Sequence, residues 1–136
     1  MKKIVTLSIK SRQEYSPDDN EIIEYTAEGI LYKKREKYYL IYENEDLEGS
    51  KSRIIIDPLS DKVSIFRDRP HLEQEFVEEQ SFSSKYHTSY GVFDMDIHTK
   101  LLDIEIDGNG GRLNIQYQLY LNKRYLSNNH LDIIWN

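Results

Sequence analysis

The side chains best suited to hold a ligand form a polar set in the middle of the chain. Arg67 follows the alternating apolar residues Val63 and Ile65, so a strand would place it on the same face as these two. A buried arginine needs an anion or several acceptors, and hydroxyl groups can orient a ligand by hydrogen bonds. We expect the set to line one mouth or the interior of the fold; the alternative is that its members bond to one another or lie at a corner. The predicted ligand-binding residues are Arg67, Tyr86, Thr88, Tyr90 and Thr99.

Two further groups contain side chains of the types that bind metal ions or transfer protons. They are Asp94, Asp96 and His98, and His71, Glu73 and Glu75. Each group repeats every second residue, which puts its members on one face of a strand. Apolar residues such as Met95 and Leu72 alternate with them, so the core takes the apolar face and the polar face meets water. We therefore predict no metal ligands, no catalytic residues and no cofactor.

Known catalytic and nucleotide-binding patterns are missing from the chain. There is no cysteine, which excludes thiolate metal sites and cysteine nucleophiles. The Gly-x-Ser-x-Gly pattern of serine hydrolases and the glycine patterns of nucleotide-binding loops do not occur. An enzyme that uses an interior acid–base pair is therefore the least supported of the functions we consider.

The elements that must position the polar set are strands, because hydrophobicity repeats every two residues along most of the chain. Val5, Leu7 and Ile9 alternate with polar residues, and about ten such segments follow one another. Within the long segment 90–106 the phase shifts at residues 101–102, which predicts a bulge or corner. The glycine-rich residues 107–111 predict a hairpin turn in which glycine supplies a positive φ.

Short turns between successive strands favour an up-and-down arrangement, and closing the sheet removes exposed edges. We therefore predict an all-β fold, an antiparallel up-and-down barrel of about 8–10 strands, with a sandwich as the alternative. The basic residues 33–37 lie between two strands and predict a solvated hairpin tip, with a local phosphate contact as the alternative. No linker or repeat divides the chain, so residues 1–136 are expected to form one domain.

Composition sets the cellular context that we expect. The net charge of -6 argues against general binding of nucleic acids or anionic membranes. No apolar run approaches the length of a transmembrane helix, and the start of the chain does not read as an export signal. We expect a cytoplasmic monomer or homodimer whose partner is a small-molecule ligand, with no nucleic acid and no membrane.

Five segments taken in order carry a resemblance to a known family. They are residues 24–29, 37–43, 86–91, 99–100 and 110–113, and the most specific is the Tyr-x-Thr-x-Tyr-Gly stretch that begins at Tyr86. The chain resembles the YwiB-like proteins, small bacterial proteins of unknown function. The match departs at Arg69, where a glycine is expected. The resemblance implies a calycin-like barrel, a lipocalin-like fold that often holds small ligands inside.

Together these features favour a non-enzymatic barrel that binds a small, partly polar ligand in its interior. Eleven tyrosines indicate an interior that is not purely apolar, since a buried tyrosine hydroxyl needs a partner. The alternative is a protein–protein interaction module with a filled barrel.

Overall fold

The computed structural model describes residues 2–44, 49–69 and 71–136, and it confirms the all-strand prediction. Ten strands follow one another, and the described residues form no helix, hence none able to cross a membrane. The strands are β1 (Lys2–Ser16), β2 (Asp19–Lys34), β3 (Lys37–Asn44), β4 (Ser50–Asp57), β5 (Lys62–Arg67), β6 (Leu72–Phe76), β7 (Ser81–Thr88), β8 (Gly91–Asp107), β9 (Gly110–Leu121) and β10 (Arg124–Trp135).

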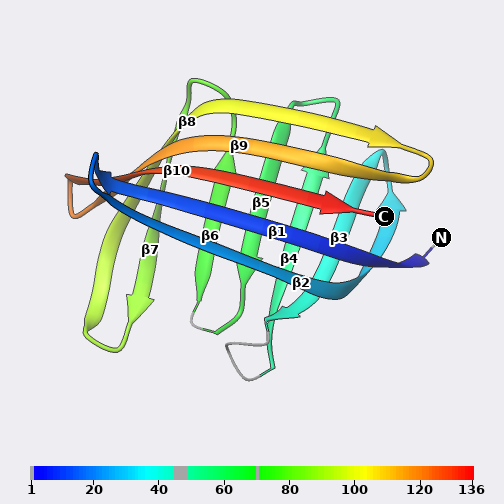
Figure 1. Cartoon of the computed structure of the whole chain (residues 1–136), viewed down its shortest axis with the longest axis horizontal. Helices are drawn as coiled ribbons and strands as arrows, with labels where there is room; N and C mark the ends of the chain where they lie inside the picture. The colour runs from blue at the N-terminus through cyan, green and yellow to red at the C-terminus, as the bar shows by residue number, and fades with distance from the viewer. Residues whose placement is uncertain (1, 45–48, 70) are drawn as a thin grey trace.

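The strands form one antiparallel sheet that curls into a nearly closed barrel (Figure 1). Its order is β6-β5-β4-β3-β2-β1-β10-β9-β8-β7, so every strand lies beside its neighbour in sequence and β1 pairs with β10. The two edges, β6 and β7, are themselves consecutive and contact each other. The Ser84 hydroxyl on β7 donates to the Glu73 carbonyl on β6 at 2.9 Å. The up-and-down barrel is thus confirmed.

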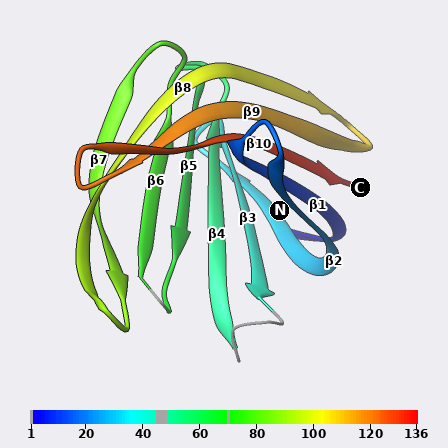
Figure 2. The ribbon, with the colours of Figure 1, turned by 60° about the vertical axis from the view of Figure 1, so that its left-hand side comes forward.

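Two curved layers face each other across the interior. One contains β8, β9, β10, β1 and β2, and it crosses the other, β3 to β7, at a steep angle (Figures 1 and 2). The register of β8 against β9 shifts between Thr99 and Leu101, so the predicted bulge is present. A bulge bends its strand, which helps β8 to pass from its partner β9 around to β7.

The core lies between the layers and follows the alternation of the sequence. Every second residue of β1, from Val5 to Ile9, points inward and is buried. Leu40, Ile54 and Leu113 meet these residues from other strands, each completely buried. Burial of this apolar surface is the main force that holds the two layers together.

The turn after β8 is present where predicted, but its glycines have a different role. Neither Gly108 nor Gly110 has a positive φ, and the Asp107 carboxylate instead accepts two backbone N–H groups of the turn at 2.7 and 3.0 Å. A Cβ at Gly111 would lie 2.2 Å from Cζ2 of Trp135. The expectation of a positive φ was therefore wrong here, and close packing against the indole explains the glycine at position 111.

The basic segment between β2 and β3 is a hairpin tip, as predicted. Arg35 and Glu36 both have positive φ, 52° and 66°, which is the backbone of a two-residue hairpin turn. These side chains lie in solvent.

Candidate functional site

A row of polar side chains crosses four adjacent strands on the inner face of one layer. Thr99 in β8 lies opposite Tyr117 in β9, Tyr117 lies opposite Asn129 in β10, and Asn129 lies opposite Gln13 in β1. Residues directly opposite in an antiparallel pair share a face. Thr99, Tyr117 and Asn129 are 0%, 9% and 2% exposed. We call these four residues the first polar row.

The other layer carries a second polar row, formed by Tyr42, Ser52 and Arg67. Ser52 in β4 lies opposite Tyr42 in β3 on one side and Arg67 in β5 on the other. Tyr42 and Ser52 are buried, and Arg67 is half-buried at the last position of β5. Asn44 donates its amide to the Ser52 hydroxyl at 2.8 Å, which fixes that hydroxyl.

The chain around Arg67 is held by its neighbour Asp68. The Asp68 carboxylate accepts the Lys51 backbone N–H and the Ser50 hydroxyl, each at 2.8 Å. These bonds, the Lys51 N–H first, lower the pKa of Asp68 below its usual value. The end of β5 is therefore tied to the start of β4, and this tie holds Arg67 in place at the inner face.

Tyr117 supplies a neutral hydroxyl to the first polar row. Burial raises its pKa to about 12, although a hydrogen bond with Gln74 of β6 acts in the opposite direction. The ring packs against Phe76, with centroids 5.0 Å apart. Near neutral pH this phenol remains protonated and can donate or accept a hydrogen bond, so it is suited to orient a ligand rather than to act as a base.

Thr99 carries the unusual group of this interior. Its backbone N–H donates to Gln80 O at 3.1 Å, and its carbonyl accepts the Glu79 N–H at 2.8 Å. Its hydroxyl is buried and has no hydrogen-bond partner among the described residues. A buried hydroxyl without a partner is unfavourable, and in native proteins it calls for an explanation such as a bound molecule.

Other members of the two rows bond to nearby polar groups. Asn129 donates to the Ser127 hydroxyl at 3.0 Å, and Asn44 and Ser52 exchange hydrogen bonds. The alternative raised from the sequence, a network of mutually bonded groups, therefore describes these pairs. The Thr99 hydroxyl does not belong to such a pair.

The structure separates the five predicted ligand-binding residues into two places. Arg67, Tyr86 and Thr99 lie on the inner face, with Tyr86 half-buried against the core. Thr88 and Tyr90 lie at the β7–β8 hairpin tip, where the Thr88 hydroxyl donates to Gly91 O and accepts the Tyr90 N–H. The Tyr90 side chain is 92% exposed. The structure therefore does not bring Thr88 and Tyr90 to the polar rows.

Sequence reasoning missed most of the residues that complete the rows. Tyr117 continues the inward alternation of Ile115 and Leu119, and Asn129 continues that of Leu131. The signal was a polar residue in phase with apolar ones. Ser52 is likewise in phase with the buried residues Ile54 and Ile56.

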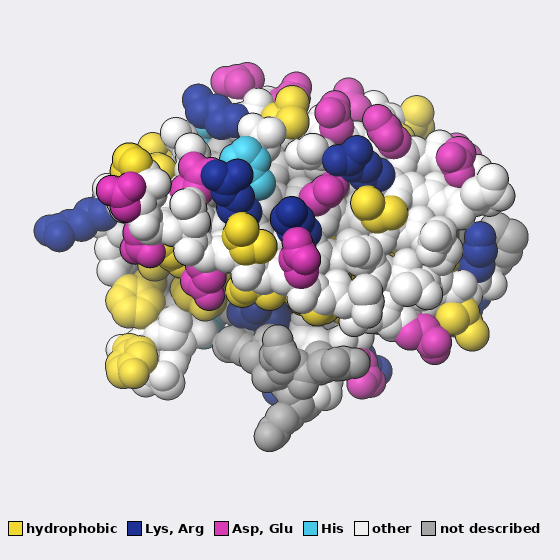
Figure 3. Space-filling view, viewed as in Figure 1, with side chains coloured by type: hydrophobic (Ala, Val, Ile, Leu, Met, Phe, Trp, Pro, Cys, Tyr) yellow, Lys and Arg dark blue, Asp and Glu magenta, His cyan; other side chains and the backbone are white. Residues whose placement is uncertain are grey.

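The two groups of side chains of the types that bind metal ions lie on the outer face, as the alternation of apolar and polar residues predicted. Asp94 contacts Lys85, and Asp96 accepts from Lys123 at 3.3 Å. The His98 ring shares a hydrogen bond with Ser81 at 3.0 Å. Acidic and basic side chains are interspersed over the outer face of the layer that contains β8, β9, β10, β1 and β2 (Figure 3). Within the described ranges, no three His, Asp or Glu side chains gather as metal ligands would.

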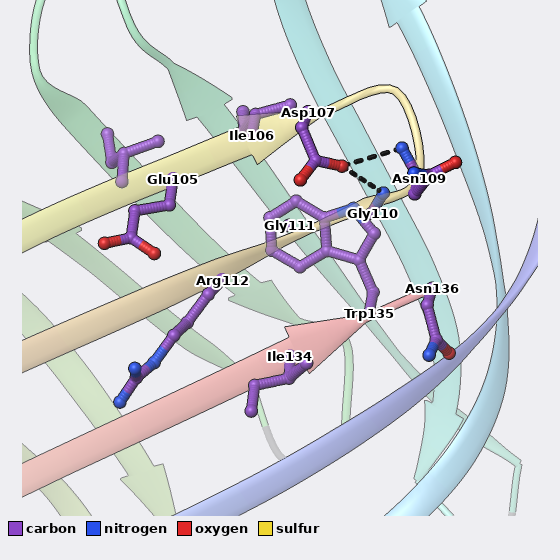
Figure 4. Close-up of a pocket in the computed structure, with 11 residues that line it drawn as sticks. Glu105, Ile106, Asp107, Asn109, Gly110, Gly111, Arg112, Ile134, Trp135 and Asn136 are labelled. Carbon is purple, nitrogen blue, oxygen red and sulfur yellow. Dashed lines mark hydrogen bonds between the residues drawn. The ribbon is translucent and has the colours of Figure 1, made fainter.

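A shallow hollow of about 540 Å³ lies where β8, β9 and β10 meet the hairpin after β8 (Figure 4). Arg112 and Ile134 line it from the outer face, and the Trp135 indole lies beside the hairpin. Arg112 forms an ion pair with Asp132 at 3.0 Å. The guanidinium is thus already engaged, and the hollow holds no convergent set of free polar groups that would define a reaction centre.

Comparison with known proteins identifies relatives that share this barrel. The chain is 31% identical over 119 residues to the uncharacterised β-barrel protein YwiB of Bacillus subtilis (strain 168), covering 86% of this chain and 82% of that protein. The crystal structure of ywiB protein from Bacillus subtilis superposes with a TM-score of 0.82 and 28% identity, covering 99% of this chain and 92% of that one. Residues 7–133 match a domain of unknown function, DUF1934. The chain therefore belongs to the DUF1934 family.

Proposed function

We propose that this protein is a non-enzymatic binding barrel that takes a small, partly polar ligand between its two polar rows. The observation that carries the proposal is the Thr99 hydroxyl, which is completely buried and has no partner among the described residues. A ligand acceptor or donor at this position would remove the free-energy cost of that group.

The rows also indicate what kind of ligand would fit. Arg67 offers a guanidinium on the inner face, which suits an anionic or carbonyl group. Tyr117 offers a neutral hydroxyl, and the surrounding core is apolar. A ligand with a polar head and an apolar body matches this surface. In this proposal the barrel is calycin-like and holds its ligand inside, and the protein is located in the cytoplasm.

The experiment is native mass spectrometry of protein purified from a Bacillus host without denaturation. We expect a reproducible extra mass that disappears when the protein is denatured. The Thr99→Val variant should lose most of that mass, and Tyr90→Phe, altered at the exposed hairpin tip, should retain it. A wild-type mass free of any adduct, or an adduct that both variants keep equally, would contradict the proposal.

A second candidate function is self-association through the outer face. Ile4, Ile30 and Ile41 lie opposite one another across β1, β2 and β3, beside a groove of about 420 Å³. Ile4 is 70% exposed and Ile30 is 43% exposed. A second copy of this chain would cover this row. The same mass spectra test it: a dimer that Ile30→Lys dissociates supports this function, and a monomer at micromolar concentration excludes it.

A further inference from the structure

A small pocket opens at the end of the barrel away from the polar rows. It has a volume of about 190 Å³ and lies between the start of β1, the β2–β3 hairpin and the ends of β8 and β10. Leu31, Tyr38, Ile106 and Trp135 provide apolar and aromatic walls. A cavity of roughly 150 Å³ can hold a benzene molecule, so this pocket has the size for a single ring with a short substituent.

Two lysines stand at the rim of this pocket. Lys3 and Lys33 line it and are exposed, and Lys33 Nζ lies 5.4 Å from the centre of the Tyr38 ring. Glu36 lies 3.8 Å from Lys33, but both side chains are exposed and such a pair is weak. The Asp107 carboxylate is bound to backbone N–H groups of its own turn (Figure 4). Lys3 and Lys33 are therefore the rim groups suited to an anionic ligand.

Trp135 adds a second, independent observation. Its side chain is 1% exposed, and its indole N–H has no hydrogen-bond partner among the described residues. Indole N–H groups usually find a partner when they are buried. The ring lies beside the Asp107–Gly110 turn, which forms one wall of the pocket (Figure 4). A ligand oxygen that reaches this donor would satisfy it.

We propose that this pocket binds a small aromatic carboxylate. The ring of the ligand packs against Trp135, Tyr38 and Leu31, and its carboxylate lies near Lys3 and Lys33. This site is separate from the polar rows, since Thr99, Tyr117 and Asn129 lie six or seven residues along their strands from the nearest residues of β8, β9 and β10 that line the pocket. The proposal therefore stands or falls independently of the function proposed above.

Trp135 is the only tryptophan of the chain, so its fluorescence reports directly on the pocket. Phenylacetate is the probe, and its neutral counterpart phenylacetamide is the matched control ligand. We expect a saturable change in emission with phenylacetate and a Kd on the order of 0.1–1 mM. In a ¹H–¹⁵N spectrum, the single indole N–H signal should move downfield as it gains an acceptor.

The charge requirement is tested with two double variants. Lys3→Gln with Lys33→Gln should weaken phenylacetate binding roughly three- to tenfold and leave phenylacetamide unaffected. Lys2→Gln with Lys34→Gln changes the net charge equally but alters neighbouring residues that do not line the pocket, so it should leave both unchanged. No saturable response at 20 mM phenylacetate, equal binding of the amide, or equal losses in the two double variants would overturn the proposal.

Discussion

Replacing Thr99 by valine should make the ligand-free protein more stable. Valine has nearly the same shape as threonine, so the packing at this completely buried position is kept and only the hydroxyl is removed. An unsatisfied buried hydroxyl costs about 1–3 kcal/mol. We expect the free energy of unfolding to rise by about 1–2 kcal/mol. Most substitutions in a core lower this quantity, so the sign itself is informative.

The expected shift in melting temperature follows from the size of the protein. A chain of 136 residues has an unfolding entropy of about 0.3 kcal/mol/K at roughly 2.1 cal/mol/K per residue, so the gain corresponds to about 3–7 °C. The assay is urea and thermal unfolding of protein refolded from denaturant, which removes any carried ligand. Thr99→Ser keeps the hydroxyl and loses a methyl group, so it should be destabilised by about 1 kcal/mol.

A lower free energy of unfolding for Thr99→Val than for the wild type would contradict this prediction. It would mean that the hydroxyl has a favourable partner, such as an ordered water molecule, in the free protein. Protein purified with its ligand should show the opposite order, with the wild type more stable than the valine variant, because a molecule that binds only the folded state stabilises it.

Three further predictions concern the fold around the two sites. Gly111→Ala should lower the free energy of unfolding, measured with urea, by about 1–3 kcal/mol, because its Cβ would meet a buried indole ring. Gly108→Ala should leave it unchanged, since nothing lies within 4 Å of a Cβ at that position. Equal effects of the two substitutions would contradict this packing. Arg35→Asn combined with Glu36→Gly should raise stability by about 1 kcal/mol, since both positions have positive φ; an unchanged urea midpoint would argue against strain there. Folding raises the pKa of the Tyr117 phenol from 10.0 to about 12, so with rising pH the phenol ionises first in the unfolded chain. Its contribution to the free energy of unfolding is therefore complete below pH 10, and about 2–3 kcal/mol is lost as the pH rises to about 12. A Tyr117→Phe variant whose free energy of unfolding falls equally steeply with alkaline pH would disprove this.

Much of the barrel could be predicted because alternation along a strand directly reports which face is buried. Val5, Leu7 and Ile9 point inward as their pattern indicated, as do Phe93, Met95 and Ile97. The phase shift near residue 101 marked the bulge. Local turn chemistry was less decisive. Gly111 must leave room for the indole of Trp135, which lies directly opposite it in β10, and nothing near Gly111 in sequence reveals this.

The candidate site was only partly predictable because it depends on register between distant strands. Arg67 was predicted from its phase with Val63 and Ile65, and both Arg67 and Thr99 face inward. The partners Tyr117 and Ser52 come from strands whose alignment no local pattern specifies. Tyr90 was predicted to belong to the same site because its hydroxyl could orient a ligand, but it lies at a hairpin tip and its side chain is exposed to solvent.

The most direct test of ligand binding inside the barrel is a high-resolution crystal structure of the protein purified without denaturation. We predict density that is not water between the two polar rows, within hydrogen-bond distance of the Thr99 hydroxyl and close to Tyr117 and Arg67. The proposed binding would be contradicted by a structure in which protein side chains or single water molecules bond to the Thr99 hydroxyl and core side chains fill the space beside it.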